Sequence, residues 1–224
     1  GPEHYRYVSM KRIMDLFSSR YLIFVGLVWA AALNVQSAAA EGAQHDFSEF
    51  PAHHIVQDVQ NNLLTTVSDF EGRLESDEKA FLAAVEVILK PIVDFNYIAR
   101  GVMGGYSDKI QPAQKTQFTE VFKGGLVSTY AKGMAAYADR DIEILPPKGD
   151  ISGQKRINVA QEVRGEGVNR VSYTMKLNRA GEWKLVNIVL NGINLGITFR
   201  TQFYQAMKKN DGNIDKVIAD WSTE

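Results

Sequence analysis

The sequence has 224 residues, with 25 lysines and arginines against 26 aspartates and glutamates and a formal net charge of −1, and it contains no cysteine. Without a basic excess it lacks the electrostatic footprint of a nucleic-acid-binding protein. Without cysteine it has no disulfides, no thiolate catalysis and no zinc site built on cysteine ligands.

The segment up to residue 40 is typical of a secretory leader. Basic residues follow Met10, an apolar run covers residues 21–33, and a run of alanines ends at Ala40. A charged start, an apolar middle of about a dozen residues and an Ala-x-Ala end are the three parts of a signal peptide. We expect residues 10–40 to be a cleaved signal peptide, with an uncleaved anchor helix as the alternative. Residues 1–9 lack an initial methionine and are excluded from the prediction of the fold.

Apolar residues at helical spacing predict helices through the first half of the remaining chain. The first two are expected over residues 55–70 and 81–89, the second ending near Pro91. A short helix is expected over residues 94–103. A long one is expected over 112–137, where a proline suits the first turn.

The long predicted helix carries an apolar residue at every fourth position. These residues are Phe118, Phe122, Leu126, Tyr130 and Met134, with Tyr137 three residues further on, and we refer to them as the ladder. Such a repeat predicts an apolar ridge along one face of the helix, and this ridge must be buried. An ordinary core and the wall of a pocket for an apolar ligand both remain open.

Beyond the long helix, strict alternation of apolar and polar residues predicts strands. They are expected over residues 141–145, 157–163, 171–177 and 183–190. Strands with one apolar face predict an antiparallel sheet of about four strands, covered on that face by helices. Two final helices are expected over residues 196–208 and 214–221. The predicted fold class is α+β, in a single domain over residues 41–224.

Several short motifs resemble, in their order and spacing, a known protein family. They are Phe95-x-Tyr97-x-Ala99-x-x-Val102-x-Gly104, then Pro112-Ala113-Gln114 with the ladder behind it, Trp183-Lys184 leading to Gly192-Ile193, and Phe199-Arg200-x-Gln202-Phe203. Together they resemble the MlaC family, also called the toluene-tolerance Ttg2D family, which are periplasmic phospholipid carriers of Gram-negative bacteria. The resemblance covers nearly all of residues 41–224. The family often has Asp where Asn187 stands and Ser where Asn194 stands.

The resemblance implies helices and a curved antiparallel sheet around a deep apolar cavity for acyl chains, with the lipid headgroup near solvent. Phospholipid is then the cargo, and neither a cofactor nor a metal is expected. The implied location is the periplasm. The implied partners are an MlaA–porin complex at the outer membrane and an MlaFEDB-type ABC transporter at the inner membrane, and the implied role is to maintain outer-membrane lipid asymmetry.

Residues of the predicted cavity come from both layers of the fold. From the helices we expect Phe95, Ile98, Val102, Met103, Phe118, Phe122, Leu126, Tyr130 and Met134. From the sheet we expect Val159, Val171, Tyr173, Met175 and Val189, with Phe199 and Phe203 closing one end. At each position the alternative is a core residue that never touches lipid.

An enzyme is the first competing class, and the histidines argue against it. His4, His45, His53 and His54 all precede the predicted core, and no Gly-x-Ser-x-Gly elbow is present. Neighbouring residues on a helix point in different directions, so His53 and His54 do not form a metal pair. We expect both at a solvated helix start.

An adaptor that docks on envelope complexes without carrying lipid is the second competing class. Arg100, Lys109, Lys115 and Lys123 are candidates for its docking surface, although scattered lysines usually only solvate a helix face. Within the carrier class, another apolar envelope lipid is the alternative cargo.

Overall fold

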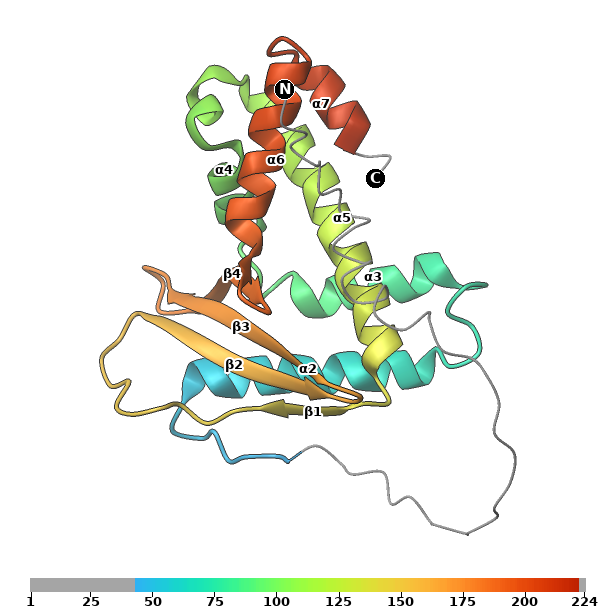
Figure 1. Cartoon of the computed structure of the whole chain (residues 1–224), viewed down its shortest axis with the longest axis vertical. Helices are drawn as coiled ribbons and strands as arrows, with labels where there is room; N and C mark the ends of the chain where they lie inside the picture. The colour runs from blue at the N-terminus through green and yellow to red at the C-terminus, as the bar shows by residue number, and fades with distance from the viewer. Residues whose placement is uncertain (1–42, 222–224) are drawn as a thin grey trace, which may run out of the picture.

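The computed structural model describes residues 43–221, so the expected signal peptide lies outside the described residues. Figure 1 shows the predicted α+β arrangement of helices around one sheet. The helices are α2 (Pro51–Asp69), α3 (Glu78–Leu89), α4 (Phe95–Met103), α5 (Pro112–Tyr137), α6 (Leu195–Lys209) and α7 (Ile214–Trp221), with the 3-10 helix η1 (Gly104–Lys109) after α4. The strands are β1 (Asp141–Ile144), β2 (Arg156–Arg164), β3 (Val168–Leu177), β4 (Trp183–Leu190) and β5 (Ile193–Asn194).

The sheet is antiparallel throughout and follows chain order, β1-β2-β3-β4-β5. The prediction of about four strands was one short, because β5 has only two residues and such a length carries no alternation. It is reached through Asn191 and Gly192, whose φ angles are +48° and +81°. A two-residue Asn-Gly connection with both φ positive is a favoured hairpin turn, so the signal for this return was present in the sequence.

Local chemistry explains where the two middle helices begin. The Asp94 carboxylate accepts a hydrogen bond from the backbone N–H of Tyr97 over 3.0 Å, which caps α4. At the start of α5, Gln111 and Gln114 form a reciprocal capping box ahead of the proline at the first position. Both predicted helix starts are confirmed.

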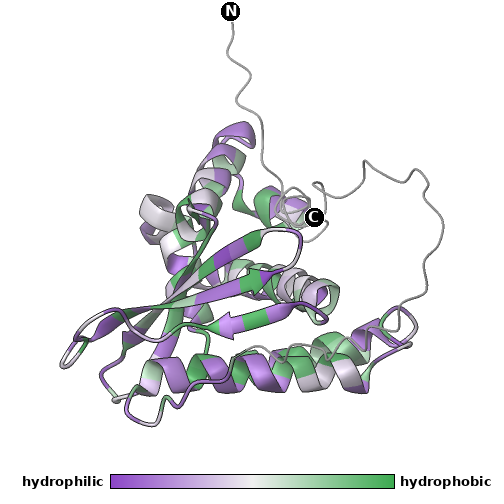
Figure 2. Cartoon of the chain, turned by 60° about the horizontal axis from the view of Figure 1, so that its bottom comes forward, coloured by the Kyte–Doolittle hydropathy of each residue, from purple (hydrophilic) through white to green (hydrophobic). Residues whose placement is uncertain are grey.

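The inner face of the sheet packs on α2, and Figure 2 shows hydrophobic and hydrophilic residues alternating along the strands. On β2 every second residue is buried, from Ile157 through Val159 and Gln161 to Val163. Gln161 is the polar exception in this row. The sheet and α2 therefore form one half of the molecule.

Helix α5 joins this half to a second one formed with α4, α6 and α7 (Figure 1). Near its start, the Phe118 ring lies 4.8 Å from that of Phe203 and 5.2 Å from that of Trp221, measured between ring centroids. Near its end, Met134 packs instead with residues of α3 and the sheet. Each step of four residues turns a helix about 40° beyond a full turn, so the ladder winds around α5 and meets two environments. The prediction of a single apolar face was wrong.

A β-bulge in β4 sets the face of its side chains. Met175 of β3 pairs with Leu185 whereas Thr174 pairs with Asn187, so Val186 is an extra residue. Side chains alternate between faces, and one extra residue exchanges the faces of everything beyond it. Beyond the bulge, Ile188 rather than Val189 lies opposite the inward-facing Tyr173 of β3.

Candidate functional site

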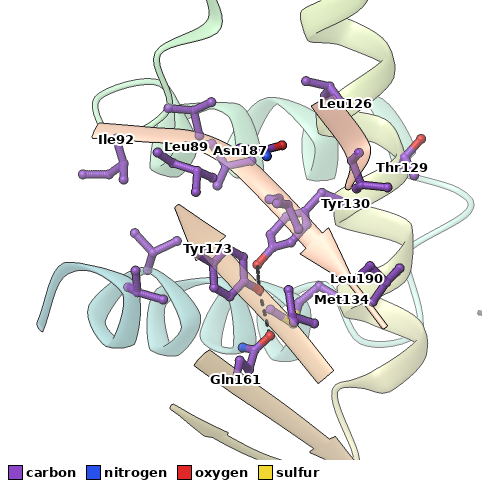
Figure 3. Close-up of a pocket in the computed structure, with 18 of the residues that line it drawn as sticks. Leu89, Ile92, Leu126, Thr129, Tyr130, Met134, Gln161, Tyr173, Asn187 and Leu190 are labelled. Atoms are coloured by element: carbon purple, nitrogen blue, oxygen red, sulfur yellow. Dashed lines mark hydrogen bonds between the residues drawn. The ribbon is translucent and has the colours of Figure 1, made fainter. Parts of the chain in front are cut away.

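A cavity lies where the two halves of the molecule meet, between α2, α5 and the inner face of the sheet. Residues near the start of α4 and of α6 complete its walls. In Figure 3, side chains from α5 and from the strands point toward one another across this space. The cavity is therefore built from segments that are far apart in the sequence.

The cavity lining is almost entirely apolar. Among the described residues that line it there is no histidine and no charged side chain, and the polar side chains are Gln60, Thr129, Tyr130, Tyr137, Gln161, Tyr173 and Asn187. The free volume is about 190 Å³, which is less than the roughly 300–1,000 Å³ of pockets for drug-sized ligands. In this conformation the space is therefore small for a ligand of that size.

Four of the polar side chains form one hydrogen-bonded chain across the cavity, and Figure 3 shows the part that runs from Tyr130 through Tyr173 to Gln161. The hydroxyl groups of Tyr130 on α5 and Tyr173 on β3 lie 3.2 Å apart. The Tyr173 hydroxyl donates to Oε1 of Gln161 over 2.7 Å, and the Gln161 amide donates to Oε1 of Gln60 over 2.8 Å. The chain therefore connects α5, β3, β2 and α2.

Burial sets the protonation of the two tyrosines in this chain. Removal from water disfavours the phenolate and raises the pKa of Tyr130, an effect that its hydrogen bond to Tyr173 partly opposes. Burial likewise raises the pKa of Tyr173 well above its usual value. Both hydroxyl groups therefore stay protonated at neutral pH and can donate.

The predicted cavity residues divide into two groups. Those that line the cavity are Phe95, Ile98, Leu126, Tyr130, Met134, Val171, Tyr173, Met175 and Phe199. Those that lie elsewhere are Val102, Met103, Phe118, Phe122, Val159, Val189 and Phe203. Contact with lipid stays a prediction for the first group.

The second group lies elsewhere for three physical reasons. Phe118 and Phe122 pack in the core between α4, α5, α6 and α7, because the ladder winds away from the cavity, and Val102, Met103 and Phe203 belong to the same core. The Val159 side chain packs in a core cluster with residues from α2 and the sheet. Val189 follows the bulge, which places its neighbours Ile188 and Leu190 on the cavity side instead.

Several lining residues were not predicted. They are chiefly Val56, Val59 and Gln60 of α2, Leu89, Ile92 and Val93 before α4, Gln161 of β2, and Leu185, Ile188 and Leu190 of β4. Gln161 had a signal, because it interrupts the apolar face of its strand. Gln60 had none, because a polar residue on an amphipathic helix is expected to face water.

The prediction of a solvated His53 was wrong. Its side chain is buried, with its ring centroid 5.3 Å from that of Phe47 and 6.0 Å from that of Phe50, and burial lowers its pKa. His54 is exposed and lies 3.1 Å from the Asp58 carboxylate. Residues before α2, such as Phe47, cover one face of the helix start, which explains why the two histidines differ. In the described part of the chain no cluster of three potential ligands suits a metal ion.

Comparison with known proteins decides the family. A model of the family described as MlaC protein matches residues 57–223. The chain belongs to the MlaC family. This confirms the resemblance inferred from the motifs. Across residues 43–221 of this MlaC family member, no helix is both long and apolar enough to cross a membrane.

Two relatives and one solved structure are similar to this MlaC family member over most of its length. The "Toluene tolerance protein ttg2D" of Pseudomonas putida is 37% identical over 175 residues, which cover 77% of this chain and 80% of that protein. The "Intermembrane phospholipid transport system binding protein MlaC" of Haemophilus influenzae is 22% identical over 180 residues, covering 79% and 80%. A phospholipid-binding protein from Ralstonia solanacearum, solved in complex with a phospholipid, shares the fold with a TM-score of 0.67. It is 21% identical, and the match covers 77% of this chain and 95% of that one.

Proposed function

We propose that this protein is a periplasmic phospholipid carrier whose cargo occupies the cavity between α2, α5 and the sheet. The observation that carries the proposal is an apolar cavity whose described lining holds no charged side chain. Each CH₂ group that leaves water for such a site contributes about 0.8 kcal/mol, so acyl chains are stabilised without any specific contact to the headgroup. The family and the names of its relatives support the same cargo.

The wider role follows from the family. We propose that the protein shuttles lipid between an MlaA–porin complex at the outer membrane and an MlaFEDB-type ABC transporter at the inner membrane, and so maintains outer-membrane lipid asymmetry. It acts as a carrier and not as an enzyme. The described histidines, His45, His53 and His54, are absent from the cavity lining, and this supports the non-catalytic proposal.

Native mass spectrometry of the protein purified without detergent, followed by lipid extraction, tests the proposal. We expect a discrete added mass that matches phospholipid. A different extracted lipid would favour another cargo. A bare protein mass that persists after incubation with phospholipid vesicles would favour a non-carrying adaptor and would overturn the proposal.

A pair of glutamate variants localises the binding to the cavity. Leu126→Glu places a carboxylate on the α5 wall, where burial of an unpaired charge is costly, and we expect lipid retention to be lost. Val87→Glu on α3 is the matched control, because Val87 is 73% exposed and lies outside the cavity lining. Equal retention in both variants would place the lipid elsewhere.

A further inference from the structure

The hydrogen-bonded chain across the cavity has a defined direction of donation. Tyr173 has one hydroxyl proton, and it donates that proton to Gln161 over 2.7 Å. In the 3.2 Å contact between the two tyrosines, Tyr130 is therefore the donor. This contact is the longest link in the chain and the one that joins α5 to the sheet.

The Tyr130 hydroxyl can change its acceptor without leaving another donor unpaired. If it turns away, Tyr173 still donates to Gln161 and Gln161 still donates to Gln60. Tyr130 and Tyr173 project from opposite walls of the cavity, so acyl chains that pass between α5 and β3 lengthen the contact between the two hydroxyl groups. A buried hydroxyl donor that loses its partner requires another acceptor.

The chemistry of the lining limits what this acceptor is. A phosphate group carries negative charge, and burying it requires a cation, which the described lining does not contain. The ester carbonyl oxygens at the head of the acyl chains are neutral acceptors with no proton to donate. They are the groups of a diacyl phospholipid that match a single neutral donor in an apolar wall.

We propose that the Tyr130 hydroxyl, positioned by Tyr173, Gln161 and Gln60, donates a hydrogen bond to an ester carbonyl oxygen of the bound lipid. This inference rests on the proposed carrier function and adds a specificity element to it. The hydrogen bond sets the depth at which the acyl chains lie. It also selects ester-linked lipids over ether-linked lipids with the same chains and headgroup.

Competition between two matched lipids tests the inference. Delipidated protein is incubated with vesicles that contain equal amounts of diester and diether phosphatidylglycerol with the same chain length, and native mass spectrometry measures the ratio bound. We expect the wild type to favour the diester lipid about two- to tenfold, the range that corresponds to the net free energy of one hydrogen bond. Tyr130→Phe keeps the ring, and we expect it to bind both lipids equally and to take up the diether lipid as well as the wild type does.

Tyr97→Phe is the control, because it removes the same hydroxyl from a residue outside the cavity lining. The Tyr97 ring lies beneath the ammonium group of Lys176. This control variant should keep the preference of the wild type. Equal uptake by the wild type, or a preference that persists in Tyr130→Phe, would overturn the inference while leaving the carrier function standing. Failure of the wild type to bind either lipid would overturn both.

Discussion

The side-chain amide of Gln161 donates a hydrogen bond to Oε1 of Gln60 over 2.8 Å, and both side chains are more than 95% buried. The contact joins β2 to α2 at the wall of an apolar cavity. An amide there has no access to bulk water, so the Gln60 oxygen supplies the acceptor that the Gln161 amide needs.

We expect Gln60→Leu to lower the free energy of unfolding by about 1–3 kcal/mol, because it leaves the buried Gln161 amide without its acceptor. Urea denaturation measures the change. The double variant Gln60→Leu/Gln161→Leu should lose less free energy of unfolding than the two single variants lose together, since no buried glutamine amide is then left without its partner. Strictly additive losses would contradict the coupling.

The buried His53 predicts a loss of stability in mild acid. Its Nδ1 atom is buried without a hydrogen-bond partner among the described residues, and burial lowers its pKa from the ordinary value of 6.5. Below that pH the unfolded chain therefore binds more protons at this site than the folded protein does. The contribution of His53 to stability is present above about pH 6.5 and declines as the pH falls toward the folded-state pKa.

Replacement of His53 by Phe should remove this component of the pH dependence, since phenylalanine has a similar shape and no proton to take up. The free energy of unfolding, measured in urea between pH 5 and pH 8, gives the slope. His54→Gln is the control for replacing a histidine at the neighbouring, exposed position. An unchanged slope in His53→Phe would assign the acid sensitivity to another group.

A single guanidinium holds together three carboxylates at the edge of the sheet. Arg164 lies within 2.6 to 3.1 Å of Glu143, Glu162 and Asp141. The hydrogen bond from Arg164 is the largest cause that lowers the pKa of Glu143, and the hydrogen bond with His45 is the next largest. Arg164→Met should lower stability, because the carboxylates then repel one another, and the loss should shrink when salt is raised from 50 mM to 500 mM.

Arg170 provides the comparison for this network. Its side chain is 75% exposed and approaches Glu162 only to 3.8 Å. Exposed ion pairs contribute little, so Arg170→Met should lose less stability than Arg164→Met at low salt. Thermal unfolding of both variants at the two salt concentrations makes the comparison, and equal losses would refute the role assigned to Arg164.

Two asparagines form a complementary pair where α6 begins. Asn187 donates to Oδ1 of Asn194 over 3.0 Å and accepts the backbone N–H of Gly196, also over 3.0 Å. Asn194 also accepts the N–H of Ile197 and caps the helix. The resemblance to the family implies that Asp and Ser are common at these two positions, and with that pair we expect the serine hydroxyl to donate to the carboxylate, which reverses the direction of the first hydrogen bond.

We expect Asn187→Asp alone to destabilise the protein by about 1–3 kcal/mol, because two acceptor oxygens then face each other. Adding Asn194→Ser should recover most of the loss, since the serine hydroxyl donates to the carboxylate and serine is a good N-cap residue. Urea unfolding of the single and double variants gives the coupling energy. A double variant no more stable than Asn187→Asp would show that the pairing does not matter.

The helices and the longer strands were predictable from short segments of sequence. The start of α5 follows from a proline and a capping box, and the strands of the sheet follow from alternation over eight to ten residues. These signals are local, because capping and periodicity act within a few residues of the chain. The motifs around Phe95 and Phe199 also indicated the family that the comparison confirmed.

The tertiary structure decided which residues reach the cavity. The bulge at Val186 exchanged the faces of Val189 and Leu190, and the winding of α5 sent Phe118 into a core while Tyr130 remained at the cavity. Gln60 became a buried partner of Gln161 only because α2 packs under β2. Burial is a property of two surfaces in contact, and a periodic pattern identifies an apolar face without identifying what covers it. The sequence by itself therefore determined the helices, the longer strands, the fold class and the family, whereas the packing of α2, α5 and the sheet determined the cavity and the polar chain within it.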